Sequence, residues 1–154
     1  MYECVIVNGR LLTETDLFAA DIGLHDGKIA AIAAPGQMLP AKKTIDASDL
    51  LILPGVIDIH WHARTPAYPE RGDFYTETRA AAAGGVTTVF EMPISKPGCA
   101  TPETFANRQR LADEQCVIDF ALFGAPGTLK RADVLKMGEM GAIAFKFFMH
   151  RAPY

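Results

Sequence analysis

Two histidines separated by one residue stand at the end of a short apolar stretch, which follows the turn pair Pro54-Gly55. A strand is predicted over residues 56–60, and the side chains of a strand alternate between its two faces. His60 and His62 should therefore point to the same side, where neutral imidazole nitrogens can bind one divalent metal ion. The spacing alone does not separate this interpretation from two histidines that lie near a strand end by chance.

A lysine lies within an aromatic run near the end of the chain. Lys146 follows Phe145 and precedes Phe147-Phe148-Met149, and we expect the three phenylalanines to belong to the core. A lysine in such surroundings is paired, neutral or functional, because burial disfavours the charged ammonium. A neutral amine can react with carbon dioxide to give a carbamate, whose two oxygens can bridge two metal ions. The alternative is a lysine that snorkels to solvent at a strand end or at a sheet edge.

The elements before the histidines are predicted to be short β-strands. They cover residues 4–7, 20–25, 28–33, 44–47 and 50–53. Asn8-Gly9 is predicted to close the first strand with a turn, and Asp26-Gly27 is predicted to join the second and third in a hairpin. We therefore expect a small N-terminal β domain over residues 1–53, built as a sheet or half a β-sandwich.

From Pro54 onward, strands and helices alternate. Strands are predicted over residues 56–60, 86–90, 117–123 and 142–148, and helices over residues 74–83, 101–115 and 128–140. The strands are almost uniformly apolar, as in a parallel sheet of an α/β protein that is buried on both faces. About four such βα units over residues 54–154 make the first half of an eight-stranded TIM barrel. Half a barrel leaves an open strand edge, so we expect the front part of a longer protein or a truncated copy.

Active sites of such barrels collect at the carboxyl ends of the strands. The residues there are His60 and His62 after the first strand, residues 91–95 after the second, residues 124–127 after the third and Lys146 on the fourth. Ser95 is a candidate substrate-binding residue. Asp58 precedes the histidines within the strand, where its carboxylate either orients a histidine ring or binds the backbone, and the two interpretations stay equally open.

Composition narrows the class of protein further. The 154 residues carry a net charge of −3, with 49% apolar and 21% charged residues, which indicates a globular protein and favours neither nucleic acid nor a membrane as partner. No apolar run reaches the length of a membrane span, and the N-terminus lacks a signal-peptide pattern. The three cysteines, Cys4, Cys99 and Cys116, are widely spaced, as expected of reduced thiols in a cytoplasmic protein.

Three motifs together resemble the cyclic amidohydrolases of the amidohydrolase superfamily, which include dihydroorotase, allantoinase, hydantoinase and dihydropyrimidinase. The motifs are PGVIDIHWH (residues 54–62), TRAAAAGGVTTVFEMP (78–93) and GAIAFKFFM (141–149). The N-terminal strands, with VNGR and DIGLHDGKIAAI, are similar to the small β domain of that group. The resemblance covers nearly the whole chain and implies a TIM-barrel hydrolase.

The resemblance implies a site with two divalent metal ions, in which His60 and His62 bind one ion and Lys146, as N6-carboxylysine, bridges it to the second. Zinc is the expected metal, although manganese, cobalt or iron also suit such ligands. A metal-bound hydroxide would attack the carbonyl carbon of a cyclic amide. The further histidine ligands and the general acid–base aspartate of the group would lie beyond Tyr154, so we assign no catalytic residue within the chain. We expect the 154 residues alone to be inactive and the full-length form to be a homo-oligomer.

Departures from the patterns of the group bear on the substrate. Arg64 matches an arginine that pairs with a substrate carboxylate in dihydroorotases, although a loop salt bridge explains it equally well. Ile94-Ser95 stands where dihydroorotases have an asparagine, and Arg151 stands where hydantoinases have a tyrosine. These departures argue against dihydroorotate, hydantoins and dihydropyrimidines, whereas residues 69–74 loosely resemble an allantoinase loop. We therefore expect a ureide or a related cyclic amide as substrate.

Two other functions stay open. Some relatives of dihydropyrimidinases have lost the metal ligands and serve as assembly scaffolds. The short chain favours that function, whereas His60, His62 and Lys146 argue against it. A mononuclear-metal deaminase of the same superfamily would also carry the paired histidines, but it would lack the bridging lysine.

Overall fold

The chain changes character at Pro54, where the computed structural model divides into two units, Met1–Pro54 and Gly55–Tyr154. The structure describes residues 1–127 and 130–149. Two predictions fall on other residues: the first residues of the helix expected over 128–140, and the contrast drawn at Arg151. They lie outside the described residues. None of the helices in the described part is long and apolar enough to cross a membrane.

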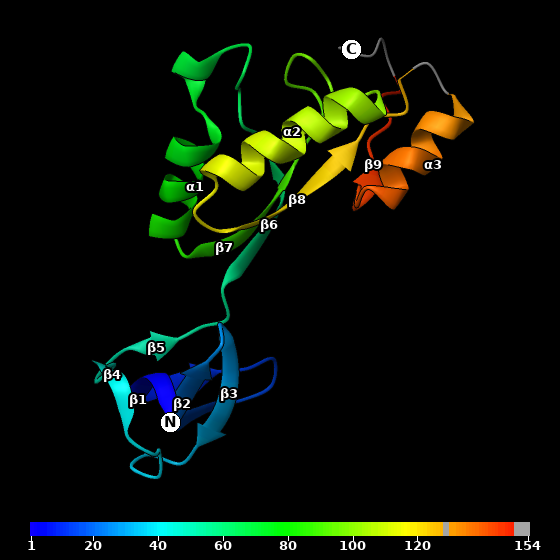
Figure 1. Cartoon of the computed structure of the whole chain (residues 1–154). Helices are drawn as coiled ribbons and strands as arrows, with labels where there is room; N and C mark the ends of the chain where they lie inside the picture. The colour runs from blue at the N-terminus through cyan, green and yellow to red at the C-terminus, as the bar shows by residue number, and fades with distance from the viewer. Residues whose placement is uncertain (128–129, 150–154) are drawn as a thin grey trace. The chain divides into compact units, whose positions relative to one another are not determined.

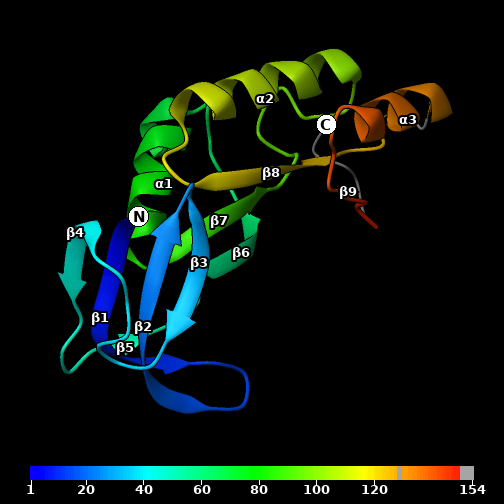
Figure 2. The ribbon, with the colours of Figure 1, turned by 60° about the horizontal axis from the view of Figure 1, so that its bottom comes forward.

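The first unit is a five-stranded sheet (Figure 2). Its strands are β1 (Tyr2–Leu12), β2 (Leu17–His25), β3 (Lys28–Ala33), β4 (Ala41–Asp46) and β5 (Leu51–Ile52). They follow the order β3-β2-β1-β4, and β5 pairs with the last part of β1. The β1–β2 and β2–β3 pairs are antiparallel, whereas β4 and β5 run parallel to β1. Leu11, Ala20 and Ile22 form the centre of its small core.

Both turn pairs predicted in this unit contain a residue with left-handed backbone, but only one of the pairs makes a hairpin. Asp26 and Gly27, with φ of 50° and 67°, turn the chain between β2 and β3 as predicted. The predicted turn at Asn8-Gly9 is wrong, because β1 continues past it and Asn8, with φ of 64°, lies at a bulge. The backbone N–H of Asn8 donates to the buried carboxylate of Asp21 (3.0 Å), which holds the bulge in place.

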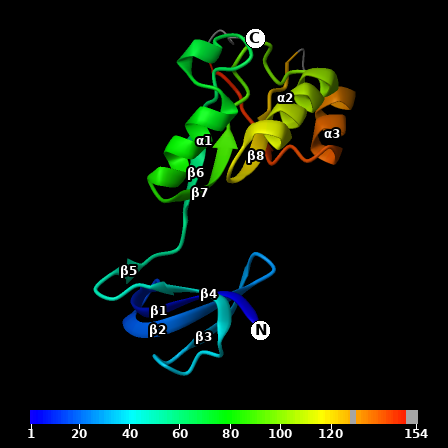
Figure 3. The same cartoon turned by 60° about the vertical axis from the view of Figure 1, so that its left-hand side comes forward.

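The second unit alternates strands and helices, as predicted, and its strands form a parallel sheet in the order β6-β7-β8-β9 (Figure 1). The strands are β6 (Val56–Trp61), β7 (Val86–Glu91), β8 (Asp119–Gly124) and β9 (Ala144–Phe145). The helices are the short 3-10 helix η1 (Pro69–Arg71), α1 (Phe74–Ala83), α2 (Pro102–Gln115) and α3 (Arg131–Glu139). Figure 3 shows α1 beside β6 and β7 and α2 beside β8, so the helices cover the outer face of a curled half barrel.

Local sequence sets where the helices of this unit begin and end. Asp73 accepts a hydrogen bond from the backbone N–H of Thr76 (2.7 Å) at the start of α1. Thr101 accepts one from the N–H of Thr104 (3.2 Å) at the start of α2. Gly85, with φ of 86°, follows α1 and lets the chain turn into β7. The predicted bounds of α1 are confirmed, and α2 begins one residue after the predicted start at residue 101.

The core of the second unit lies between the helices and the sheet. Phe74 of α1, Phe105 of α2 and Met137 of α3 are all almost completely buried in one cluster. Trp61 of β6 packs against this cluster, with its ring centroid 5.8 Å from that of Phe74. The residue between the two histidines is therefore anchored on the helix side of the sheet.

The prediction that all four strands are buried on both faces is wrong for β6. Val56, Ile57 and Ile59 are 54%, 57% and 63% exposed. The reason is the position of β6 at an edge of the sheet: within the described part of the chain it pairs with β7 alone.

The fourth strand is shorter than predicted. Residues 142–148 were expected to form it, but β9 contains only Ala144–Phe145, because among the described residues it pairs with β8 alone. Phe145 packs against the core and Phe148 is half-buried, whereas Phe147 is 64% exposed. The expectation that all three phenylalanines belong to the core is therefore wrong for Phe147.

Candidate metal centre

Strand β6 brings the paired histidines to the carboxyl edge of the parallel sheet. His60 lies in β6, and His62 follows the strand immediately. Because the Trp61 ring packs on the helix side, the alternation of side chains directs both imidazoles away from that core. Their ring centroids lie 5.5 Å apart, and the ring planes are tilted by 55°. The structure thus brings the two predicted ligands together.

The environment of His62 favours a neutral imidazole. Burial is the main cause that lowers the pKa of His62. The positive charges of Arg64, His60 and Lys146 lower it further, and the carboxylate of Asp58 acts in the opposite direction. The Nδ1 atom of His62 is buried and has no hydrogen-bond partner within residues 1–127 and 130–149. A neutral imidazole with an unused nitrogen fits the requirements of a metal ligand.

Lys146 reaches the same edge of the sheet directly after β9. Its backbone N–H donates to the carbonyl of Gly124 (2.9 Å). The side chain is half-buried, and Nζ lies 5.6 Å from the ring centroid of Phe148. Because the charge of Lys146 lowers the pKa of His62, the lysine is within electrostatic range of the histidine pair. The three predicted metal-site residues therefore share one edge of the sheet.

Asp58 bonds to the backbone of its own strand. Its Oδ1 atom accepts a hydrogen bond from the N–H of His60 (3.0 Å), and the side chain is half-buried. This contact corresponds to the backbone-bonded alternative considered for Asp58. It steadies the backbone at His60, and a role in orienting an imidazole ring stays a prediction.

The two candidate substrate-binding residues, Arg64 and Ser95, both lie close to the histidine segment: Arg64 follows His62 by two residues, and Ser95 bonds to Ala63. Arg64 is half-buried, and its charge lowers the pKa of both His62 and Glu91. Ser95 is 5% exposed, and its hydroxyl donates to the backbone carbonyl of Ala63. The hydroxyl of Ser95 is thus directed at the protein. Contact of either residue with a substrate stays a prediction.

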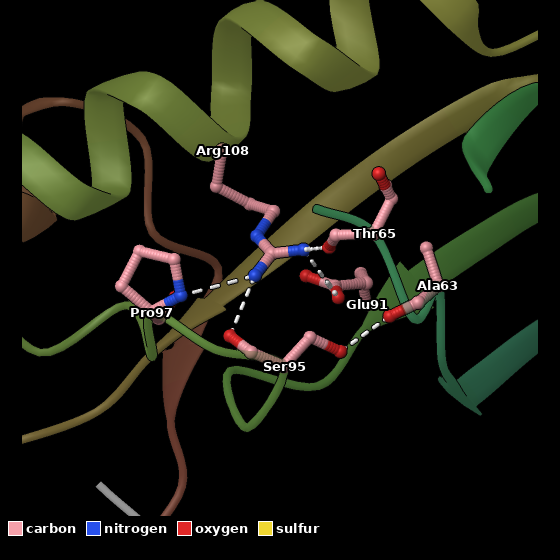
Figure 4. Close-up of polar contacts among 6 residues, drawn as sticks. All are labelled: Ala63, Thr65, Glu91, Ser95, Pro97 and Arg108. Atoms are coloured by element: carbon pink, nitrogen blue, oxygen red, sulfur yellow. Dashed lines mark hydrogen bonds and ion pairs between the residues drawn. The ribbon is translucent and has the colours of Figure 1, made fainter. Parts of the chain in front are cut away.

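Arg108 was not predicted from the sequence, although its guanidinium lies close to this edge of the sheet. It lies on α2, is almost completely buried, and its Nη1 is 3.5 Å from Oε1 of the buried Glu91 (Figure 4). Burial raises the pKa of Glu91 to about 8, and the charges of Arg108 and Arg64 oppose this shift. The sequence did contain a signal: Arg108 follows Phe105 by three residues and precedes Ala112 by four, on the buried face of the helix.

Comparisons with known proteins relate the chain to enzymes named hydantoinase and allantoinase. No protein-family model matches it. It is 38% identical over 152 residues to an L-hydantoinase of Paenarthrobacter aurescens, covering 97% of this chain and 33% of the relative. It is 37% identical over 153 residues to an allantoinase of Solibacter usitatus, covering 97% of this chain and 32% of the relative.

The solved structures that this chain resembles are also hydantoinases. An L-hydantoinase (dihydropyrimidinase) from Arthrobacter aurescens matches with a TM-score of 0.91 and 37% identity, covering 98% of this chain and 34% of that chain. A D-hydantoinase matches with a TM-score of 0.83 and 31% identity, covering 97% of this chain and 33% of that chain. The curled half barrel is therefore the N-terminal part of the TIM barrel of these neighbours, as predicted.

The fold and the motifs define a member of the amidohydrolase superfamily. Within it, the chain belongs to the cyclic amidohydrolases, the group of its hydantoinase and allantoinase relatives. The chain spans about a third of the length of the curated relatives it matches. The contrast with hydantoinases drawn at Arg151 stays a prediction, and an L-hydantoinase is among these relatives.

Proposed function

We propose that this chain is the N-terminal part of a metal-dependent hydrolase that opens a cyclic amide or ureide. The histidine pair carries the proposal, because its imidazoles lie 5.5 Å apart at the carboxyl edge of the sheet. The lowered pKa of His62 and its buried Nδ1, which lacks a partner in the described part of the chain, support metal binding there. The similarity to an L-hydantoinase and an allantoinase supports the class of substrate.

Different residues of the chain would bind the two metal ions. His60 and His62 would bind one ion through neutral ring nitrogens, and zinc suits such ligands. Lys146 would act after its neutral amine attacks carbon dioxide, which forms an N–C bond, releases one proton and leaves N6-carboxylysine. When bound, the two ions would polarise the substrate carbonyl and lower the pKa of a water molecule. Three such side chains leave a two-metal site incomplete, so we expect no turnover of a cyclic amide by the 154 residues alone.

Arg64 would bind and orient the substrate. A guanidinium can pair with an anionic or carbonyl group through two parallel hydrogen bonds. Its half-buried position and its effect on the pKa of His62 support a location beside the metal centre. Ser95 would contact a substrate only after its hydroxyl had turned away from the carbonyl of Ala63.

Zinc titration of the chain by isothermal calorimetry at neutral pH tests this function. The wild-type chain should bind zinc, and His60→Ala or His62→Ala should each weaken the affinity by about ten-fold or more. His25→Ala is the matched control. His25, Glu3 and Asp26 form an exposed group that could hold a cation, so this variant tests whether zinc binds there instead. Its zinc affinity should equal that of the wild-type chain.

Two outcomes would contradict the metal site: a wild-type chain that takes up no zinc, or a His62→Ala variant that binds zinc as tightly as the wild type. A chain that takes up no metal and self-associates would instead favour the scaffold function.

A further inference from the structure

Every second backbone carbonyl at the end of β6 and just beyond it is bound by a group from outside that segment. The acceptors are the carbonyls of Trp61, Ala63 and Thr65, and the donors, in the same order, are the backbone N–H of Met92 (2.9 Å), the hydroxyl of Ser95 and the guanidinium of Arg108. In extended backbone, alternate carbonyls point to the same side. Two side chains therefore continue the hydrogen bonding between β6 and β7 past the end of the strand, alongside His62.

Arg108 lies at the centre of this arrangement, as Figure 4 shows. Its Nη2 donates to the carbonyls of Ser95 (2.7 Å) and Pro97 (3.3 Å), while its Nη1 donates to the carbonyl of Thr65. One side chain from α2 thus ties the segment after β6 to the loop after β7. Because it holds the backbone of Ser95, it also keeps the Ser95 hydroxyl aimed at Ala63.

The carboxyl group of Glu91 lies beside this guanidinium. Its Oε1 lies 3.5 Å from Nη1 of Arg108, and both side chains are almost completely buried. Neither carboxyl oxygen of Glu91 makes a hydrogen bond with the described residues. A buried guanidinium is costly unless hydrogen-bond acceptors surround it. Three carbonyls meet that requirement and commit Arg108 to this position.

We propose that Arg108 is a positioning residue of the metal centre, which holds the backbone beyond His62 and thereby fixes the His62 imidazole relative to His60. The inference rests on the proposed function, because the geometry that Arg108 protects is that of the histidine pair. In this role Arg108 touches neither metal nor substrate. Its removal would free the carbonyls of Thr65, Ser95 and Pro97, whereas His60 would stay within β6, which pairs with β7.

Zinc affinity of folded variants gives the first test. Groups that orient a metal-binding histidine are typically worth about 10–100-fold in affinity, so Arg108→Gln should bind zinc at least about ten-fold more weakly than the wild type. Arg108→Lys should recover part of the loss, because an ammonium keeps the charge but lacks the planar fork. Arg110→Gln, which removes an exposed arginine of the same helix paired with Glu114, should bind like the wild type. Equal zinc affinity in folded Arg108→Gln and the wild type would overturn the proposal.

Amide hydrogen exchange gives a second test that needs no metal. The N–H of Met92 is bonded to the carbonyl of Trp61, and the N–H of Arg64 to the carbonyl of Gly72. Both should exchange faster in Arg108→Gln than in Arg110→Gln. If the wild-type chain takes up no zinc, the metal site itself fails. Unchanged exchange at both amides would then overturn the positioning role too, and faster exchange confined to this segment would support it.

Ser95→Ala keeps Arg108 in place and removes only the hydrogen bond from the Ser95 hydroxyl to the carbonyl of Ala63. It therefore gives a milder test should Arg108→Gln not fold. It should weaken zinc binding by less than Arg108→Gln and accelerate exchange at Arg64. Wild-type behaviour of Ser95→Ala in both measurements, together with full recovery of zinc affinity in Arg108→Lys, would overturn the proposed arrangement.

Discussion

The imidazole rings of His60 and His62 lie 5.5 Å apart, while the indole ring between them packs against Phe74 on the opposite side of the strand. This relationship follows from the two-residue period of a strand, because a core position at Trp61 directs both of its neighbours to the other face. The pair therefore depends on β6 and on the few residues that extend it. Substitutions elsewhere in the second unit should affect the histidine pair by displacing that backbone.

Lys146 should form a carbamate when carbon dioxide and zinc are present, because a divalent ion stabilises the carbamate anion. Carbon-13 NMR of the chain in labelled bicarbonate should show a carbamate carbon in the wild type and none in Lys146→Ala. Lys136→Ala is the control, since Lys136 is an exposed lysine of α3 that pairs with Glu139 (3.2 Å). A carbamate signal of equal intensity in Lys146→Ala and the wild type would exclude Lys146 as its source.

Glu91 should make the chain less stable as the pH rises. Burial raises the pKa of Glu91 from an ordinary 4.5 to about 8 in the folded chain, so between these values the folded state keeps a proton that the unfolded state releases. Linkage then predicts that the free energy of unfolding falls with pH across this window, by up to about 1.4 kcal/mol per pH unit. Urea unfolding at several pH values measures the slope.

Glu91→Gln should flatten this slope, because glutamine has no proton to lose. Glu114→Gln removes an exposed carboxylate of α2 that pairs with Arg110, and it should keep the wild-type slope. If Glu91→Gln and the wild type showed the same dependence on pH, Glu91 would not be the group that titrates.

The N-cap of α1 should contribute measurably to stability. Asp73→Ala removes the acceptor of the Thr76 N–H (2.7 Å) and should lower the free energy of unfolding by about 1 kcal/mol. Hydrogen bonds from Thr76 lower the pKa of Asp73, so the cap acts fully above the ordinary pKa of an aspartate and weakens as the pH falls through the lowered one. Asp113→Ala, at an exposed position of α2, is the control for urea unfolding. A loss in Asp73→Ala no larger than that of the control would contradict the role of the cap.

Local patterns predicted most elements of the second unit because their ends are set by short-range contacts. Helix α1 covers Phe74–Ala83 as predicted, since Asp73 caps its start and Gly84-Gly85 ends it. The shared face of His60 and His62 followed from strand alternation in the same way. The Asn8-Gly9 pair was misjudged because left-handed backbone serves a bulge as well as a turn. The bond to Asp21, which decides between them, joins residues far apart in sequence.

Arg108 shows why part of the site could not be predicted. Its position on the buried face of α2 can be read from the spacing to Phe105, but its acceptors cannot. They are backbone carbonyls of two separate loops, at Thr65, Ser95 and Pro97, which come together only in the folded sheet. A sequence pattern shows which side chains can donate or accept. These contacts depend instead on the positions of backbone carbonyls in the folded chain.

The ring nitrogens of the histidines give the most direct test of the metal centre. Nitrogen-15 NMR of the wild-type chain during a zinc titration follows the four histidines separately. Nitrogen resonances of both His60 and His62 should shift together as zinc is taken up, while those of His25 stay in place. Zinc uptake that leaves the resonances of His60 and His62 unchanged would contradict the proposed metal site.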